Sequence, residues 1–337
     1  NIYTGASKVV NKVDMLSTPE YVALRKEAFA NDGETPDDQN APDLVLWDQN
    51  KTTDWQDMII GNTAKLTQVQ ASVSGGNEQT RFLLSTSYRH ETTVLPNDLP
   101  FHRGAVYLNL DHSSVDKKFN ITTSVSYSGI KDRSLASDVT SFYNFAPNYP
   151  VYDDEGKFYW YRNAQNPIAY LQRRNTNKTK NLVANSVIRY TVLPGLNVKT
   201  RLGLTQTNMD QMQVYPKVVF NPESSIGSMT YFGNSEVSSY IIEPQVDYTR
   251  RIGEGKLQLL AGGSWQENTR QGKSFIADGF SSDALLEDIG SAGSVTVRTP
   301  TLYKKYNYNS FFGRATYNWK EKYIVNASFR RDGSTRF

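Results

Sequence analysis

The fold of this chain is decided by residues 306–337, which read YNYNSFFGRATYNWKEKYIVNASFRRDGSTRF. Over residues 311–319 every second residue is apolar or small, and the residues between them are mostly polar, with Phe312 the exception. A few polar residues at 320–322 reverse the chain, and the alternation then resumes from Tyr323. A period of two over both arms indicates paired β-strands, each with one apolar face and one wet face.

Aromatic side chains gather at the turn end of the apolar face of this hairpin. Tyr317, Trp319 and Tyr323 lie there, which suits the aromatic girdle at the edge of a transmembrane β-barrel. The edge of a soluble β-sandwich would alternate as well. The interpretation therefore depends on how often the unit recurs along the chain.

The composition suits a β-barrel better than a large globular core. The 337 residues are 38% hydrophobic with a mean hydropathy of −0.57, and no run of 18 apolar residues predicts a transmembrane helix. A barrel with a polar lumen fits, because only one face of each strand must be apolar. The net charge of +3 without a Lys/Arg run gives no indication of nucleic-acid binding. The absence of Cys excludes disulfides and thiolate metal sites.

One helix is predicted before the main run of strands, after a short strand within residues 1–10. Ser17 can cap this helix, Pro19 suits its first turn, and Glu20 completes a capping box. The helix ends near Gly33. The segment that follows, Asp37 to Lys51, is rich in Pro, Asp and Asn and is predicted to be a loop.

From Leu66 onward the strand pattern recurs to the end of the chain. We count eleven strands joined by ten connections, which alternate strictly between long and short. The long connections include Ile130–Lys180, Asp210–Glu236 and Gln271–Lys305. Short turns at one end and long loops at the other are typical of an up-and-down outer-membrane barrel, whereas a Greek-key sandwich has no reason to keep that parity.

Charged side chains are sorted between the two strand faces. In the central parts of the well-patterned strands the apolar face carries no Lys, Arg, Asp or Glu, as a bilayer would enforce at roughly 2–4 kcal/mol per midplane Lys or Arg. The residues predicted to face lipid are Phe119, Ile121, Val125, Tyr127, Tyr317, Trp319 and Tyr323. Those predicted to line the lumen are Arg81, Arg89, Lys199, Arg201, Glu243, Asp247, Arg314 and Arg330.

Two points stay open at this level. Arg201 and Arg314 would line a substrate path, or would pair across strands with Glu243 or Asp247, which is the commoner use of facing charges. Pro244 falls on the predicted lipid face and cannot donate a ladder hydrogen bond, so we expect a bulge or a broken strand there.

No catalytic or metal-binding constellation stands out. The sequence contains no G-x-S-x-G, H-E-x-x-H or P-loop motif, and its three His, at 90, 102 and 112, lack the close spacing of a metal site. The acidic run Asp153–Gly156 lacks the full EF-hand spacing and reads as a solvated turn. We predict no enzyme activity, no cofactor and no metal.

Short motifs along the chain point to a family. They are Asp54-Trp55-Gln56-Asp57, Ser72–Asn77 running into Thr80-Arg81-Phe82, Asn109–His112, Pro150–Asp153 before Gly156, Asn166-Pro167, Phe312-Gly313-Arg314 and Arg330–Ser334. Together, and in this order, they resemble the SusC/RagA family of TonB-dependent outer-membrane transporters. No single motif is specific, but the set covers almost the whole chain.

The resemblance implies a 22-stranded barrel closed around an N-terminal plug, with long extracellular loops and short periplasmic turns. Residues 1–337 would be the first half of that barrel, and we expect the plug upstream and the remaining strands downstream. The family would import oligosaccharides or peptides across the outer membrane of a Gram-negative, Bacteroidetes-like bacterium. Its partners would be TonB, acting through the plug, a SusD-like surface lipoprotein as lid, and outer-membrane lipid.

The longest predicted loop contains an aromatic cluster next to an arginine. Tyr159, Trp160, Tyr161 and Arg162 would suit capture of a sugar or peptide at the mouth of a transporter. Alternatively, these residues pack the loop onto itself or onto the lid protein, because long loops need a small core of their own. Two further interpretations of the whole chain remain, a passive porin-like barrel and a soluble glycan-binding or adhesin β protein.

Overall fold

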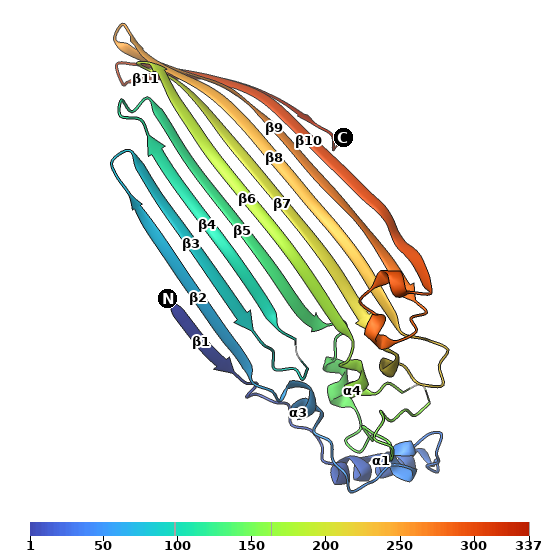
Figure 1. The fold of residues 1–337 in the computed structure, drawn as a ribbon. Helices are drawn as coiled ribbons and strands as arrows, with labels where there is room; N and C mark the ends of the chain where they lie inside the picture. Colours follow the sequence, from blue (N-terminus) through green and yellow to red (C-terminus); the bar gives the residue numbers. More distant parts are fainter. Residues whose placement is uncertain (98, 163, 337) are drawn as a thin grey trace.

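The computed structural model describes residues 1–97, 99–162 and 164–336. All strands in this part of the chain form one sheet, in which every strand pairs antiparallel with its neighbours in sequence (Figure 1). The predicted all-β, up-and-down arrangement of eleven strands is therefore confirmed. The alternative of a Greek-key sandwich, in which two sheets stack, is wrong. The strands are β1 Ile2–Ser7, β2 Ala64–Gly76, β3 Thr80–Glu91, β4 Phe101–Ser113, β5 Phe119–Leu135, β6 Arg174–Leu193, β7 Leu196–Tyr215, β8 Met229–Ile252, β9 Gly255–Asp278, β10 Ser294–Trp319 and β11 Tyr323–Ser334.

The hairpin β10–β11 forms as its alternation predicts. Trp319 pairs with Tyr323 at the turn, and their rings stack with centroids 5.7 Å apart. Lys320 and Glu321 have φ values of 54° and 58°, since so short a reversal between twisted strands requires positive φ. The Tyr317 hydroxyl donates to the carbonyl of Ile252 at 3.1 Å, which ties this turn to the neighbouring one.

Short turns and long connections lie at opposite ends of the sheet (Figure 1). The predicted alternation of their lengths is confirmed. In the turn between β6 and β7, Gly195 has a φ of 86°, and a Cβ there would lie 2.2 Å from the Thr249 carbonyl oxygen. Only glycine fits this position, because the next strand passes so close.

The long loops are shorter than the sequence pattern predicts. The loop predicted over Ile130–Lys180 covers only residues 136–173, since β5 continues to Leu135 and β6 begins at Arg174. The loops predicted over Asp210–Glu236 and Gln271–Lys305 shrink in the same way, to 216–228 and 279–293. Beyond the apolar stretch both faces of each strand are largely polar, so the period of two that marks a strand is lost there.

The predicted disruption at Pro244 is mild. The strand β8 is unbroken, and its pairing with β7 runs straight through the Thr200–Pro244 pair. On the β9 side, the ladder omits the two positions between the Ile242–Trp265 and Gln245–Gly262 pairs, with no change of register. The missing N–H therefore costs local hydrogen bonds, and the expected bulge or break does not form.

The helix α1 spans Thr18–Asp32 as predicted. The Ser17 amide donates to Glu20 Oε2 at 2.9 Å, and Gly33 ends the helix in the left-handed conformation at φ 68°. The hydroxyl and amide of Ser17 lower the pKa of the Glu20 carboxyl. The following segment is not wholly a loop, because α2 forms over Pro42–Val45.

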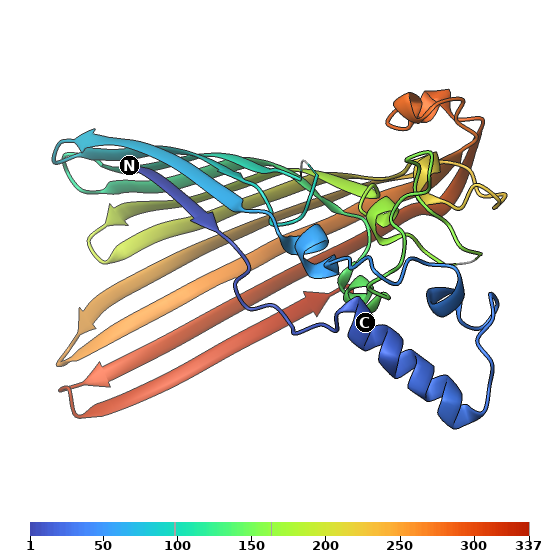
Figure 2. The same cartoon turned by 90° about the horizontal axis from the view of Figure 1, so that it is seen from below.

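The helices and long loops collect at one end of the curved sheet, and among the described residues no layer packs on either face of the sheet along most of its length (Figure 2). The buried apolar clusters of the described chain lie in these loops rather than on the sheet. No helix among the described residues is long and apolar enough to cross a membrane. Besides α1 and α2, the loop elements are α3 Trp55–Ile60, α4 Pro167–Tyr170, and the 3₁₀ turns Thr140–Asn144, Lys217–Val219, Asp283–Leu285 and Ile289–Ser291.

Candidate functional site

The strand register sorts every sheet residue onto one of two faces, because residues directly opposite in a ladder point the same way. One row crosses the sheet through residues that are almost all apolar, and we call its side the apolar face. The other side is called the polar face. The row runs through Leu84, Leu108, Val125, Ala184, Leu204 and Tyr240.

A band of uniform length marks the apolar face. On six successive strands it extends over nine residues, and its face-pointing side chains include no Lys, Arg, Asp or Glu. Eight steps along a strand correspond to about 27 Å. The band covers Phe119–Tyr127, Leu182–Tyr190, Leu196–Leu204, Tyr240–Tyr248, Leu257–Trp265 and Phe311–Trp319.

The band is displaced across the sheet, by two residues at three of the five steps between neighbouring strands. The ladder row of Tyr127 on β5 reaches Lys305 on β10, but the band on β10 ends at Phe311, six residues away. Six residues correspond to about 20 Å along the strand, and five strand spacings to about 24 Å across it. A level band therefore requires strands tilted by about 40°, within the range of transmembrane barrels.

The seven residues predicted to face lipid all lie on the apolar face by register. They mark both edges of the band. Phe119, Tyr317, Trp319 and Tyr323 lie toward the short turns, and Tyr127 lies at the edge toward the long loops with 45% of its surface exposed. An exposed apolar surface of this extent, bounded by aromatic rings, needs a nonaqueous neighbour.

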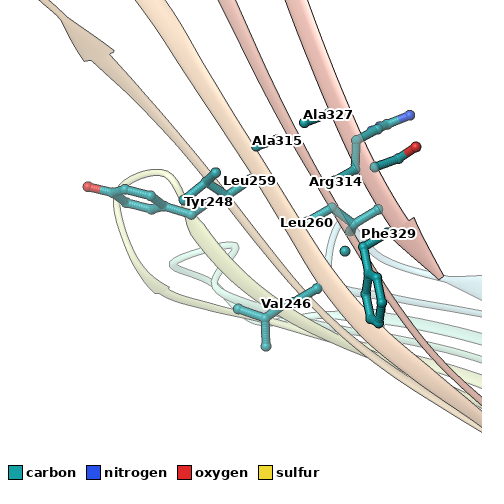
Figure 3. A pocket seen from close by; sticks show the side chains of 11 residues that line it. Val246, Tyr248, Leu259, Leu260, Arg314, Ala315, Ala327 and Phe329 are labelled. Carbon is teal, nitrogen blue, oxygen red and sulfur yellow. The ribbon is translucent and has the colours of Figure 1, made fainter. Parts of the chain in front are cut away.

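The apolar face is hollowed between β8 and β11. Small residues at Ala261, Gly313, Ala315 and Ala327 leave a depression of about 550 Å³, with Val246, Tyr248 and Phe329 among its lining residues. Figure 3 shows Arg314 pointing away from Tyr248, to the other side of the strands.

The eight residues predicted to line the lumen all lie on the polar face. Arg201 stands directly opposite Glu243, but the Glu243 carboxylate accepts from Ser264 Oγ at 3.0 Å. Asp247 likewise accepts from Asn197 Nδ2 at 2.7 Å. Among the described residues neither acid forms an ion pair with an arginine, so the alternative of cross-strand pairing with Glu243 or Asp247 is not observed.

Two of the predicted lumen arginines have partners on their own strand. Arg330 Nε donates to Asp332 Oδ1 at 2.9 Å, and Arg89 forms an ion pair with Glu91. Arg330 also donates to the Tyr308 hydroxyl at 2.7 Å. The polar face therefore combines paired arginines with cations such as Arg201, which forms no ion pair with another described residue.

The long loops form a separate small structure, which we call the loop cap: α1 to α3 together with residues 136–173. Its centre is aromatic. Trp55 Nε1 donates to the Ala146 carbonyl at 3.1 Å, and Tyr149 packs edge-on against Trp47 with centroids 5.0 Å apart. Burial raises the pKa of the Tyr149 hydroxyl. Sequence reasoning missed this core, because its members are far apart in the chain.

The predicted ligand-binding aromatics are largely engaged in the loop cap. The Tyr159 hydroxyl accepts from Trp47 Nε1 at 3.2 Å, and its ring lies edge-on to Tyr149 at 5.6 Å. The Tyr161 hydroxyl donates to the Asp38 carbonyl, and the Arg162 guanidinium lies 5.2 Å from the Tyr161 ring. This arrangement matches the alternative in which the loop packs onto itself. Trp160 is half-buried and Arg162 is exposed.

A second unpredicted cluster joins α1 to α2. Arg25 Nε donates to Asp43 Oδ2 at 2.7 Å, and the Tyr21 hydroxyl donates to the same oxygen at 3.1 Å. Burial, with the nearby Asp43 charge, raises the pKa of Tyr21 to about 12. The hydrogen bond to Asp43 raises the pKa of Arg25. The only local sign of this cluster is that Tyr21 and Arg25 share a face of the helix, because Asp43 is brought to them by the tertiary fold.

The geometry offers little for covalent chemistry. His90 and His102 stack with centroids 4.5 Å apart, but in the described chain no group of three or more His, Asp or Glu is placed to hold a metal ion. Asp153 Oδ1 accepts from the amides of Glu155 at 3.0 Å and Lys157 at 2.8 Å, as in an ordinary turn. What the arrangement can do is separate an apolar medium from a polar interior and present loops at one end.

An antiparallel meander with a tilted apolar band on one face, charged residues on the other and a loop cap at one end is the arrangement of an outer-membrane β-barrel wall. The comparisons with known proteins agree, although no family model matches the chain. The sequence is 24% identical over 344 residues to TonB-dependent receptor P3 of Formosa agariphila, and 24% identical over 365 residues to TonB-dependent receptor SusC of Bacteroides thetaiotaomicron. The resemblance to the SusC/RagA family is confirmed.

Each alignment covers 98% of this chain but only 33% and 34% of the relative, so the chain spans about a third of these curated proteins. Among solved structures, the RagAB peptide transporter matches with a TM-score of 0.78 at 20% identity, over 100% of this chain and 42% of that one. The structural match to this transporter therefore covers the whole of the present chain.

Proposed function

We propose that residues 1–337 form about half of the barrel domain of a SusC-like, TonB-dependent importer in the outer membrane of a Gram-negative, Bacteroidetes-like bacterium. The barrel would have 22 strands, with a plug upstream and the remaining strands downstream. In this assignment the apolar face contacts lipid, the polar face lines the lumen, the long loops are extracellular and the short turns periplasmic.

The observation that carries the proposal is the nine-residue apolar band. The band keeps its length over six strands, and the side chains that it presents on the apolar face are all uncharged. Its offset across the sheet corresponds to a strand tilt of about 40°. At this tilt its height is about 21 Å, close to the apolar band of outer-membrane barrels. A soluble sheet has no reason to hold such a band level.

The transport mechanism in this proposal is binding and gated passage without covalent chemistry. TonB would act through the plug, and a SusD-like surface lipoprotein would close over the long loops. Oligosaccharides or peptides are the proposed substrates, a choice supported by the SusC resemblance and by the description of RagAB as a peptide transporter. Trp160 and Arg162, with the polar-face cations, are the residues proposed to meet them.

A pair of neighbouring substitutions tests the assignment of the faces. Val125→Arg places a cation at the centre of the apolar band, whereas Ser124→Arg places the same cation on the polar face. We expect the first variant to block outer-membrane assembly and the second to assemble normally, since a midplane arginine costs roughly 2–4 kcal/mol in lipid. Equal effects in a membrane-assembly assay would show that the faces are assigned wrongly.

Energy coupling separates this proposal from a passive porin-like barrel. Uptake by the complete protein should stop when TonB is deleted, whereas diffusion through a porin would continue.

The alternative of a soluble glycan-binding or adhesin protein is tested by extraction. Such a protein would stay in aqueous buffer after cell lysis, but the proposed barrel would need detergent.

A further inference from the structure

A group of lysines stands just beyond the loop-side edge of the apolar band. Lys131 on β5 and Lys178 and Lys180 on β6 point to the same side as the band and are all exposed. We call these three residues the lysine patch. The strands that carry them lie next to one another in the middle of the sheet (Figure 1).

The lysine patch places like charges opposite one another. Lys131 and Lys178 are direct ladder partners, and on the other side of Lys131 the partner is His102. Lys180 follows two residues along β6, opposite Gly129. Like charges directly opposite in a sheet are destabilising, so this arrangement calls for a negative group between them.

The described chain places one negative side chain directly opposite the patch on the same face, Asp210 across from Lys178, but the two form no ion pair. Asp132 follows Lys131 and points to the polar face. A single carboxylate leaves the three lysines with an excess of positive charge. None of the ion pairs between described residues involves a lysine of the patch. By contrast, Lys305 on the same face is held by Glu267 at 2.9 Å.

The height of the patch matches the polar layer of a membrane. Lys180 lies two residues beyond the last band residue of β6, Leu182, and Lys131 lies four residues beyond Tyr127 on β5. At a tilt of about 40° these offsets put the side chains about 5 and 10 Å above the apolar band. The polar headgroup layer occupies this height, and cationic side chains extend toward it.

We infer that the lysine patch binds the phosphate groups of a phosphorylated lipid headgroup in the leaflet on the long-loop side. This inference rests on the proposed membrane orientation. A phosphomonoester carries close to two negative charges and three acceptor oxygens, which suits several ammonium groups that converge on one point. The exposed Tyr127 below the patch gives the acyl chains an aromatic contact at the band edge.

The test uses the protein as its gene encodes it, purified in detergent. Native mass spectrometry measures its affinity for lipid A with both phosphates and for the same lipid after phosphatase treatment. The charge-reversal variant is Lys131→Glu/Lys178→Glu/Lys180→Glu. Its matched control changes three exposed lysines at the short-turn end, Lys117→Glu/Lys256→Glu/Lys322→Glu.

We expect the phosphorylated lipid to bind the parent protein at least about tenfold more tightly than the dephosphorylated one, and the patch variant to lose about tenfold or more. The control should change by less than about twofold, because its lysines lie at the other membrane surface. If the Glu variant fails to assemble, the triple Gln variant replaces it, with the same direction of change expected.

Equal affinities of patch variant and parent would overturn the inference while leaving the importer proposal intact. Displacement of the lipid by millimolar inorganic phosphate would also overturn it, because the site would then serve a free anion. Failure of the parent protein to fractionate with membranes would instead reject the proposed function itself.

Discussion

The sheet and the loop cap of this protein are stabilised in different ways. In the sheet, large apolar residues of the central strands stay exposed, and Leu204 on β7 and Leu259 on β9 are 39% and 41% exposed. In the loop cap, by contrast, Tyr149 and Ile59 are almost completely buried. The sheet is held by its backbone ladders and leaves its apolar face uncovered, whereas the cap has a core of its own. Damage to one region should therefore leave the other largely unaffected.

The largest effect is expected from Tyr149→Ala in the loop cap. Removing this buried ring from the aromatic centre should destabilise the cap by about 3–5 kcal/mol. Limited proteolysis should then cleave residues 136–173 while the strands stay protected. The control is Tyr152→Ala, whose ring is half exposed and stacks on Phe158 at 5.5 Å. Similar cleavage in both variants would contradict a cap with its own core.

The sheet is tested by an arginine at the band. Leu204→Arg, at the loop-side edge of the apolar band, should cost about 1 kcal/mol or less in a bilayer, because the cost of an arginine falls from the midplane toward the interface. Thr205→Arg, one residue along on the polar face, is the matched control and should change little. Reversible unfolding in lipid vesicles measures the difference. A larger loss for Thr205→Arg would reverse the faces.

Alkaline pH should weaken the cap at the cluster of Tyr21, Arg25 and Asp43. The pKa of Tyr21 is raised to about 12 in the folded protein, so its contribution to stability is present below pH 10 and is lost as pH rises toward 12. Absorbance of ionised tyrosine together with amide exchange in α1 should follow this loss. In Asp43→Asn the negative charge beside Tyr21 is absent, and the ionisation should move to lower pH. An unchanged midpoint in this variant would argue against the cluster.

The smallest effect is expected from Lys157→Ala. Its ammonium lies 2.7 Å from Glu155, but both side chains are about three-quarters exposed. Exposed pairs of this kind are worth less than about 1 kcal/mol, so we expect no measurable change in cap stability or protease resistance. A clear loss would mean that surface charges hold the cap as much as its core does.

The sequence predicts the sheet well because the period of two is a local property. Val125 and Ser124 reveal their faces by position alone, and every face assignment agrees with the register. The strand ends are missed, since past Leu182 or Phe311 both faces become polar and the pattern vanishes. The cap is missed for another reason. Trp47, Trp55 and Tyr149 meet only through tertiary folding, which no short pattern records.

The same limit applies to the candidate ligand site. The aromatic run at Tyr159 is visible in the sequence, but its hydrogen bond from Trp47 is not, so packing and binding could not be told apart. The lysine patch was missed as well. Lys131 and Lys178 are 47 residues apart, and only the register between β5 and β6 brings them together.

The strands continue far past the apolar band. On β8 the polar part runs from Tyr240 back to Met229, eleven residues, or about 37 Å along a strand and about 28 Å in height at the inferred tilt. In the proposed orientation the barrel wall would therefore extend well above the bilayer. A bulky carbohydrate layer on the cell surface would then surround this extension of the strands and leave its opening clear. Large cargo would reach the entrance without first crossing that layer.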